Sequence, residues 1–232
     1  MTPDAALRAR LAEVDARIAE AAMAAGRDAA AIARIVVTKF HPAALVRELA
    51  ALGVREVGEN RQQELTAKQG ELADLPELRW HFIGQAQTNK ARAIRAAASV
   101  VHSVDRDRLA DALDRAGEED GSPPLDILLQ INLTDDPGRG GVAPAGVAAL
   151  AEHAAGRTTL RVRGVMAVAP LDEDPASAFA RLRACSETLR TVVPGADWIS
   201  AGMTGDFVEA IAAGATHLRI GSAITGPRPT GG

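Results

Sequence analysis

The chain has 232 residues, of which 47% are hydrophobic and 24% are charged, and its net charge is −4. This length suits one large domain, and the negative balance does not favour nucleic acid or an acidic membrane as a partner. A single cysteine, Cys185, excludes a disulfide within the chain and fits a reducing compartment. No segment is long and apolar enough to span a bilayer, so we expect a cytoplasmic protein.

The first predicted element is an extra N-terminal helix that precedes the repeating part of the fold. Thr2 and Pro3 suit the N-cap and first helical positions, and Gly26 suits the end. One apolar face is formed by residues at spacings of four, three and four, namely Leu7, Leu11, Val14 and Ile18. The stripe is short, which favours packing on the domain's own core over a coiled-coil partner.

After this helix, short β-branched runs alternate with helical patterns. The predicted strands are Ile35–Lys39, Val54–Gly58, Arg79–Gly84, Ser99–Val104, Leu125–Asn132, Arg161–Ala167, Asp197–Ser200 and His217–Ile220. The predicted helices between them start near Pro42, Asn60, Thr88, Asp105, Pro144, Asp174 and Met203. Eight strands separated by single helices imply parallel pairing with right-handed crossovers. The count predicts a single α/β domain, a (β/α)8 TIM-type barrel, with a doubly wound open sheet as the alternative.

No change in composition marks a second domain. We assign the barrel to residues 1–226 and a mobile C-terminal tail to residues 227–232, since the Gly- and Pro-rich end does not favour regular structure. With no second domain available for a partner subunit, we expect a monomer.

Lysine usage singles out one residue. The chain contains three lysines against twenty-three arginines, and Lys39 ends the first predicted strand. Active sites of such barrels lie at the C-terminal ends of the strands. A deprotonated lysine amine can form a Schiff base with an aldehyde, which an arginine guanidinium cannot do. The alternative is an ordinary cation at a strand end. The other two lysines, Lys68 and Lys90, are expected on helix surfaces.

The last two predicted strands are followed by turns that suit an anion. Ser200 leads into Gly202-Met203 at the start of a helix, and Arg219 is followed by Gly221-Ser222. Backbone N–H groups in glycine turns and at helix starts bind phosphate, and barrels of this kind often place a phosphate there. Ordinary helix capping and tight turns are the alternative explanation.

Three further polar residues are candidates for the mouth of the barrel. Asn60 and His81 follow or end the second and third strands, where neutral side chains suit hydrogen bonds to a ligand hydroxyl. Arg219 could face a ring nitrogen and keep it unprotonated, which would make a pyridine a poorer electron sink. The alternatives are a satisfied buried histidine and a solvated strand-end charge. The remaining histidines show no metal-ligand spacing, so no metal is assigned.

Several segments resemble the pyridoxal phosphate homeostasis proteins, stand-alone barrels similar to the N-terminal domain of alanine racemase. The matching segments are Val37–Pro42, Gly58–Glu64, Trp80–Gly84, Thr88–Lys90, Arg163–Met166, Gly202–Met203 and Arg219–Ile224. They run nearly end to end in the same order. The family commonly has a second lysine where Phe40-His41 stands, and a more acidic stretch after Met203.

The resemblance implies a pyridoxal 5'-phosphate cofactor bound covalently to Lys39 as an internal aldimine. It also implies that Ser200, Met203, Gly221 and Ser222 hold the phosphate. Arg219 would then face the pyridine nitrogen, and Asn60 and His81 would line the cofactor pocket.

Three functions follow as hypotheses. The first is a non-catalytic carrier in pyridoxal phosphate homeostasis, with the cofactor and apo-enzymes that depend on it as partners. The second is a small monomeric amino-acid racemase with His81 as second base; against it, the racemases resembled use a tyrosine, and this chain has none. The third, from fold analogy alone, is a phosphosugar-binding barrel enzyme without a covalent cofactor.

Overall fold

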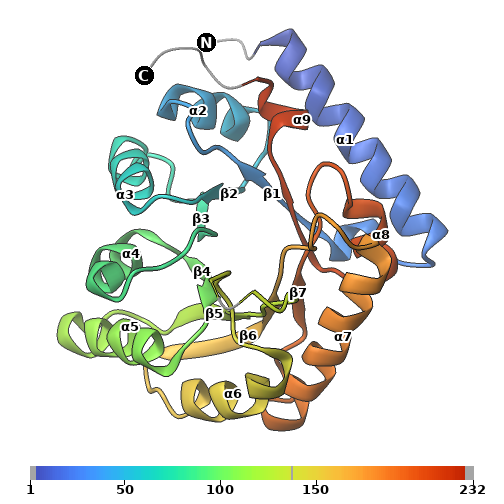
Figure 1. The fold of residues 1–232 in the computed structure, drawn as a ribbon. Helices are drawn as coiled ribbons and strands as arrows, with labels where there is room; N and C mark the ends of the chain where they lie inside the picture. The colour runs from blue at the N-terminus through green and yellow to red at the C-terminus, as the bar shows by residue number, and fades with distance from the viewer. Residues whose placement is uncertain (1–3, 137, 228–232) are drawn as a thin grey trace.

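The computed structural model describes residues 4–136 and 138–227, which form a closed parallel barrel surrounded by helices (Figure 1). The strands are β1 Ala33–Val37, β2 Glu56–Glu59, β3 Arg79–Phe82, β4 Val100–Val104, β5 Leu125–Gln130, β6 Leu160–Met166, β7 Trp198–Ser200 and β8 His217–Ile220. Each strand pairs in parallel with the next, and β8 returns to pair with β1, where Ile35 lies opposite Arg219. This closure confirms the predicted (β/α)8 barrel and excludes the open sheet.

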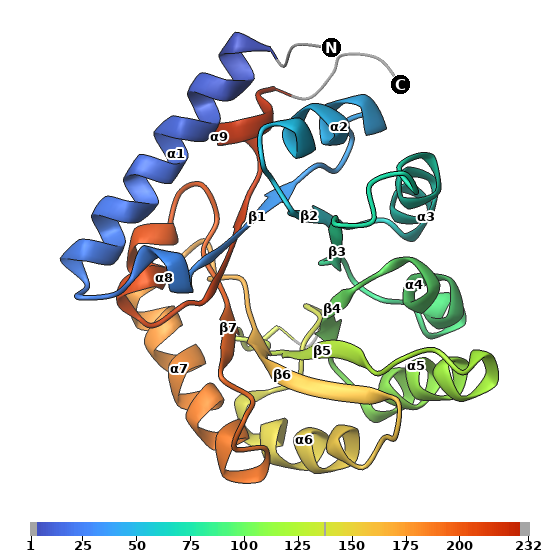
Figure 2. The same ribbon diagram turned by 180° about the vertical axis from the view of Figure 1, so that it is seen from behind.

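The helices lie outside the strands, so that each strand is covered by the connection to the next (Figures 1 and 2). They are α1 Ala5–Ala24, α2 Ala43–Ala51, α3 Gln62–Glu71, α4 Ala91–Ala97, α5 Asp107–Asp120, α6 Val147–Ala155, α7 Pro175–Val192, α8 Phe207–Ala212 and α9 Ser222–Thr225. Three short 3-10 turns are η1 Ala29–Ala31, η2 Thr88–Lys90 and η3 Pro144–Gly146. The main core lies between the strands and this outer layer, and it is built mostly of aliphatic side chains and alanines, with a few aromatic rings.

The extra helix α1 runs along the outside of the barrel against the short helices α8 and α9 (Figure 2). Its predicted apolar face is buried, as the four residues Leu7, Leu11, Val14 and Ile18 show. Arg10 Nε donates to the Ile224 carbonyl at 2.7 Å, which ties α1 to the last helix. The helix therefore covers the side of the barrel that the brief final helices leave uncovered.

Some predicted boundaries were wrong. The N-cap of α1 is Asp4, whose carboxylate accepts from the Ala6 N–H. The predicted N-cap Thr2 lies outside the described residues, as does most of the predicted tail, residues 228–232. Strand β1 ends at Val37, two residues before the predicted end, because the chain turns at Lys39 and Phe40. The helix expected from Met203 starts only at Phe207.

Candidate functional site

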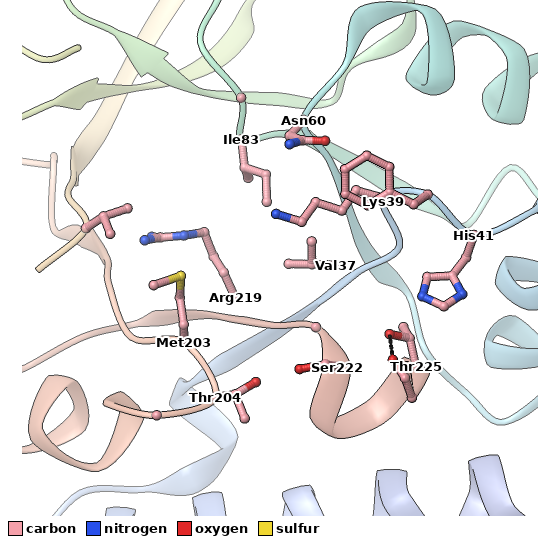
Figure 3. Close-up of a pocket in the computed structure, with 16 residues that line it drawn as sticks. Val37, Lys39, His41, Asn60, Ile83, Met203, Thr204, Arg219, Ser222 and Thr225 are labelled. Atoms are coloured by element: carbon pink, nitrogen blue, oxygen red, sulfur yellow. Dashed lines mark hydrogen bonds between the residues drawn. The ribbon is translucent and has the colours of Figure 1, made fainter. Parts of the chain in front are cut away.

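A cavity of about 600 Å³ opens at the C-terminal ends of the strands (Figure 3). Six of the eight predicted site residues line it: Lys39, Asn60, Met203, Arg219, Gly221 and Ser222. They come from the ends of β1, β2, β7 and β8, which are far apart in the sequence. In Figure 3 the Lys39 amine extends toward the space between Ile83 and Arg219. The barrel therefore brings an amine, a guanidinium, an amide and two glycine-containing turns to one cavity.

The segment that carries Lys39 is held by a buried cluster of Thr38, Glu59 and Lys68. Lys68 Nζ donates to the Thr38 carbonyl at 2.9 Å and to Glu59 Oε1 at 2.6 Å. The Thr38 hydroxyl donates to the same carboxylate oxygen at 2.6 Å. Only 6% of Lys68 is exposed, so the prediction that it is a solvated surface lysine was wrong. Its ammonium group therefore holds the backbone carbonyl of the residue immediately before Lys39.

The turn after Lys39 has an unusual backbone conformation. Phe40 has a φ of 68°, in the left-handed region that L-residues other than Asn and Asp seldom adopt. Its N–H donates to Glu64 Oε2 at 2.9 Å, and the Lys39 amine lies 5.8 Å from the centre of its ring. The Glu64 carboxylate on α3 therefore helps to hold the strained turn that directs Lys39 into the cavity.

Arg219 is anchored before it reaches the cavity. Its Nη1 donates to Ser200 Oγ at 2.7 Å and its Nη2 donates to the Ala167 carbonyl at 2.8 Å. Burial lowers its pKa to about 10, although the nearby Asp206 charge acts in the opposite direction. The guanidinium is therefore still positively charged at neutral pH and has a defined plane.

Asn60 lines the cavity, and its side chain carries a buried acceptor. Its Oδ1 is buried and makes no hydrogen bond within the described part of the chain. A buried polar atom without a partner is unfavourable, so a rotation of this side chain that brings the oxygen to a ligand donor would be stabilising. Gly84 allows its own backbone and that of Asn60 to lie close together. A Cβ at Gly84 would lie 2.0 Å from the Asn60 carbonyl oxygen, and so no larger residue fits there.

The turn after β7 forms another wall of the cavity. Gly202 has a φ of 89°, and a Cβ there would lie 2.7 Å from the Ala210 Cβ. The Met203 N–H donates to Asp206 Oδ1 at 2.6 Å, and the next two residues, Thr204 and Gly205, line the cavity. The Asp206 carboxylate thus stabilises this turn, and α8 starts only after it, at Phe207.

The remaining two predicted site residues do not line the cavity. Both ring nitrogens of His81 have partners, and the ring is fully buried inside the barrel. Ser200 is also fully buried, and its hydroxyl contacts Arg219 and His102. The inward-facing strand positions explain this placement, since side chains there fill the barrel interior. The prediction that His81 and Ser200 contact a cofactor directly is untested, and their burial inside the barrel does not support it.

Several lining residues were not predicted. They are Val37, Phe40, His41, Ile83, Gly84, Val168, Thr204, Gly205, Thr225 and Gly226. Most follow the ends of β1, β3, β6 and β7, so the rule that barrel sites lie at these ends could have found them. His41 is buried at the edge of the cavity, and burial together with the Lys68 charge lowers its pKa.

Two negative findings apply to residues 4–136 and 138–227. No group of three or more His, Cys, Asp or Glu side chains there could hold a metal ion. No helix in the same ranges has the length and apolar composition needed to cross a membrane.

Comparison with known proteins identifies the family. The family described as "Alanine racemase, N-terminal domain" matches residues 9–229. The pyridoxal phosphate homeostasis protein of Pseudomonas aeruginosa is 47% identical over 224 residues, which cover 95% of each chain. The protein of the same name from Escherichia coli is 36% identical over 94% of this chain and 95% of its own. This chain therefore belongs to the pyridoxal phosphate homeostasis protein family, within the alanine racemase N-terminal domain family.

Solved structures agree with the fold. PipY of Synechococcus elongatus with pyridoxal phosphate (PLP) bound is 38% identical, with a TM-score of 0.79 over 89% of this chain and 99% of its own. Alanine racemase of Corynebacterium glutamicum is 16% identical, with a TM-score of 0.66 over 94% of this chain and 62% of that one. At that identity the racemase likeness concerns the fold alone.

Proposed function

We propose that this protein binds pyridoxal phosphate through Lys39 and takes part in pyridoxal phosphate homeostasis as a carrier. The observation that supports it most is the meeting of the Lys39 amine with the Arg219 and Asn60 side chains in one cavity. The bound cofactor supplies an aldehyde, which condenses with an amine to a Schiff base with loss of one water molecule. The cofactor in the related PipY supports the same ligand here.

The residues of the cavity match the parts of this ligand. The Gly221-Ser222 turn and the Met203–Gly205 turn suit the phosphate, because glycines allow backbone N–H groups to approach an anion closely. Asn60 Oδ1 could accept a hydrogen bond from a ring hydroxyl. Arg219 would face the ring nitrogen, and its positive charge disfavours protonation of that nitrogen. This arrangement suits holding the cofactor rather than stabilising a carbanion on it.

Racemisation needs a second base on the opposite face of the substrate. The chain contains no tyrosine, and His81 lies inside the barrel with both ring nitrogens hydrogen-bonded. His41 lines the cavity, but in Figure 3 its ring lies away from the Lys39 amine. We therefore propose a non-catalytic role, in which the protein limits free aldehyde and supplies the cofactor to apo-enzymes. Incubation of the loaded protein with α-deuterated alanine tests this role, since rapid loss of deuterium would favour the racemase.

The covalent bond is tested by reduction with borohydride and mass mapping of the modified peptide. We expect a pyridoxyl-phosphate adduct on Lys39 in the wild type and in Lys90→Ala, and no adduct on that peptide in Lys39→Ala. Lys90 is a suitable control because it lies on the neighbouring rim, beside Asn60 and Gln87, but does not line the main cavity. An unmodified Lys39 after incubation with excess cofactor would overturn the proposal and favour a phosphosugar ligand.

A further inference from the structure

A chain of hydrogen-bonded side chains crosses the inside of the barrel from its N-terminal end to the cavity. Glu56 Oε2, on the first residue of β2, lies 2.5 Å from His81 Nε2. His81 Nδ1 lies 2.8 Å from His102 Nε2, and His102 Nδ1 lies 2.9 Å from Ser200 Oγ. Ser200 Oγ accepts from Arg219 Nη1 at 2.7 Å. Four strands and the cavity-lining guanidinium are thus connected by one series of bonds.

The middle of this chain is dry. His81, His102 and Ser200 each have no exposed surface. In such surroundings a donor that faces a donor, or an acceptor that faces an acceptor, is strongly unfavourable, because no water can replace the missing bond. The direction in which each hydrogen bond donates is therefore determined by its neighbours.

The Glu56 carboxylate sets the direction of donation for the whole series of hydrogen bonds. An ionised carboxylate can only accept, so His81 Nε2 must carry the proton that it donates. In a neutral imidazole the other nitrogen is then an acceptor, so His102 Nε2 must donate to His81 Nδ1. By the same rule His102 Nδ1 accepts from the Ser200 hydroxyl. The Ser200 oxygen is left with lone pairs, and it accepts from Arg219.

With Glu56 ionised, the opposite direction would require a charged imidazole in the interior. If His81 were doubly protonated, His102 could donate from Nδ1 to Ser200, which would then accept twice and leave its own proton without an acceptor. Burial lowers the pKa of both rings, and for His102 the nearby positive charge of Arg219 acts in the same direction. Although burial raises it, hydrogen bonding to His81 brings the pKa of Glu56 below its ordinary value.

We propose that Glu56, His81, His102 and Ser200 are positioning residues that hold Arg219 in one orientation toward the bound cofactor. This inference rests on the proposed function, in which Arg219 faces the ring. It gives Ser200 a role behind the guanidinium instead of at the phosphate. A free arginine side chain has many rotamers, and the bonds to Ser200 and Ala167 remove much of that freedom before a ligand arrives.

The direction in which these hydrogen bonds donate can be measured without any cofactor, from the tautomers of the two histidines. Two-bond 15N–1H spectra of the full-length, histidine-labelled protein at pH 7 distinguish the two neutral tautomers and the charged ring. Each signal is assigned by its loss in His81→Gln and His102→Gln. We expect the Nε2–H tautomer for both rings. An Nδ1–H tautomer or a doubly protonated ring at either position would overturn the proposal, and this measurement needs no variant that must hold the cofactor.

The effect on the cofactor is tested with two serine variants. Ser200→Ala removes the acceptor of Arg219, and we expect the dissociation constant for pyridoxal phosphate to rise about tenfold, as for the loss of a hydrogen bond to a charged group. Ser103→Ala is the matched control, because Ser103 is a buried strand serine whose hydroxyl has no hydrogen-bond partner within the described residues. Its dissociation constant should stay within about twofold of the wild type.

The outcomes separate the two proposals. Equal effects of Ser200→Ala and Ser103→Ala would overturn the positioning role while leaving the Lys39 adduct intact. A shifted absorption spectrum of the bound cofactor in Ser200→Ala, with the adduct still on Lys39, would support it, since general loosening of the fold would change Ser103→Ala equally. If the wild type forms no adduct, the proposed function fails, and the tautomer spectra alone decide the direction of the chain.

Discussion

At the scale of single residues, Lys39 and Lys68 show that two lysines of one protein can have different structural roles. Lys39 lies at the cavity, whereas Lys68 is buried against Glu59 and the carbonyl of Thr38. Glu59 Oε2 is buried without a partner among the described residues, and burial raises the pKa of this carboxyl against the effect of Lys68 and Thr38. The ion pair therefore supports the Lys39 segment only while both partners are present.

Replacing Lys68 should expose this dependence. Lys68→Met keeps an unbranched side chain that is one atom shorter but leaves the Glu59 carboxylate buried without its cation, which costs about 3–5 kcal/mol. We expect the free energy of unfolding in urea to fall by that amount, and the Lys39 adduct to form more slowly. Lys90→Met, at a partly exposed site, should change stability by less than about 0.5 kcal/mol. A loss below 1 kcal/mol in Lys68→Met would contradict the supporting role.

At the scale of elements, the close approach of the ends of β2 and β3 forms the Asn60 side of the cavity. These strands pair in register, with Gly58 opposite His81, and the chain continues to Gly84 beside the Asn60 carbonyl. The contact leaves no room for a side chain. The positions of two elements, and not the chemistry of Gly84, thus decide which residue is allowed there.

Gly84→Ala should push these strand ends apart. A Cβ at 2.0 Å from a backbone oxygen cannot be accommodated by rotamer changes, so we expect a loss of about 1–3 kcal/mol of stability and weaker binding of pyridoxal phosphate. Gly70→Ala is the control, since a Cβ in α3 there meets nothing within 4 Å. That helix substitution should raise stability by about 0.5–1 kcal/mol. Equal thermal midpoints for the two variants would argue against the close approach.

At the scale of the whole molecule, the barrel interior gathers three histidines from β3, β4 and β8. The ring centres of His81 and His102 lie 5.0 Å apart, and each lies 6.4 Å from that of His217. Burial lowers the pKa of all three rings, that of His217 to about 3. The folded barrel therefore keeps them neutral in a pH range where the unfolded chain binds protons.

This arrangement predicts stability that falls in mild acid. Below about pH 6.5 the unfolded chain takes up protons that the folded chain excludes, so the free energy of unfolding rises with pH and is lost as pH falls. Each such histidine contributes a slope of about 1.4 kcal/mol per pH unit between its unfolded and folded pKa, for His217 down to about 3. Urea unfolding from pH 7 to 5 measures the slope, and His217→Asn should reduce it. A flat profile would show that the rings titrate normally.

The sequence pattern was sufficient for the architecture and for the position of the cavity at the strand ends. Alternation of eight β-branched runs with helical segments has few compact solutions, because each strand must be covered and each crossover is right-handed. Strand-end positions then marked Lys39, Asn60, Arg219 and the Gly221-Ser222 turn, all of which line the cavity. The family resemblance was confirmed by the comparisons.

Only the tertiary structure decided which way side chains face and what they contact. The one-residue alternation of a strand places His81 and Ser200 inside the barrel, although both lie near strand ends. Lys68 became a buried support because the cluster around Glu59 is assembled from β2, α3 and the chain after β1. Hydrophobic periodicity reports which elements form, because it depends on neighbours along the chain. Hydrogen-bond partners and burial depend on residues distant in sequence, and closure of the barrel alone brings these together.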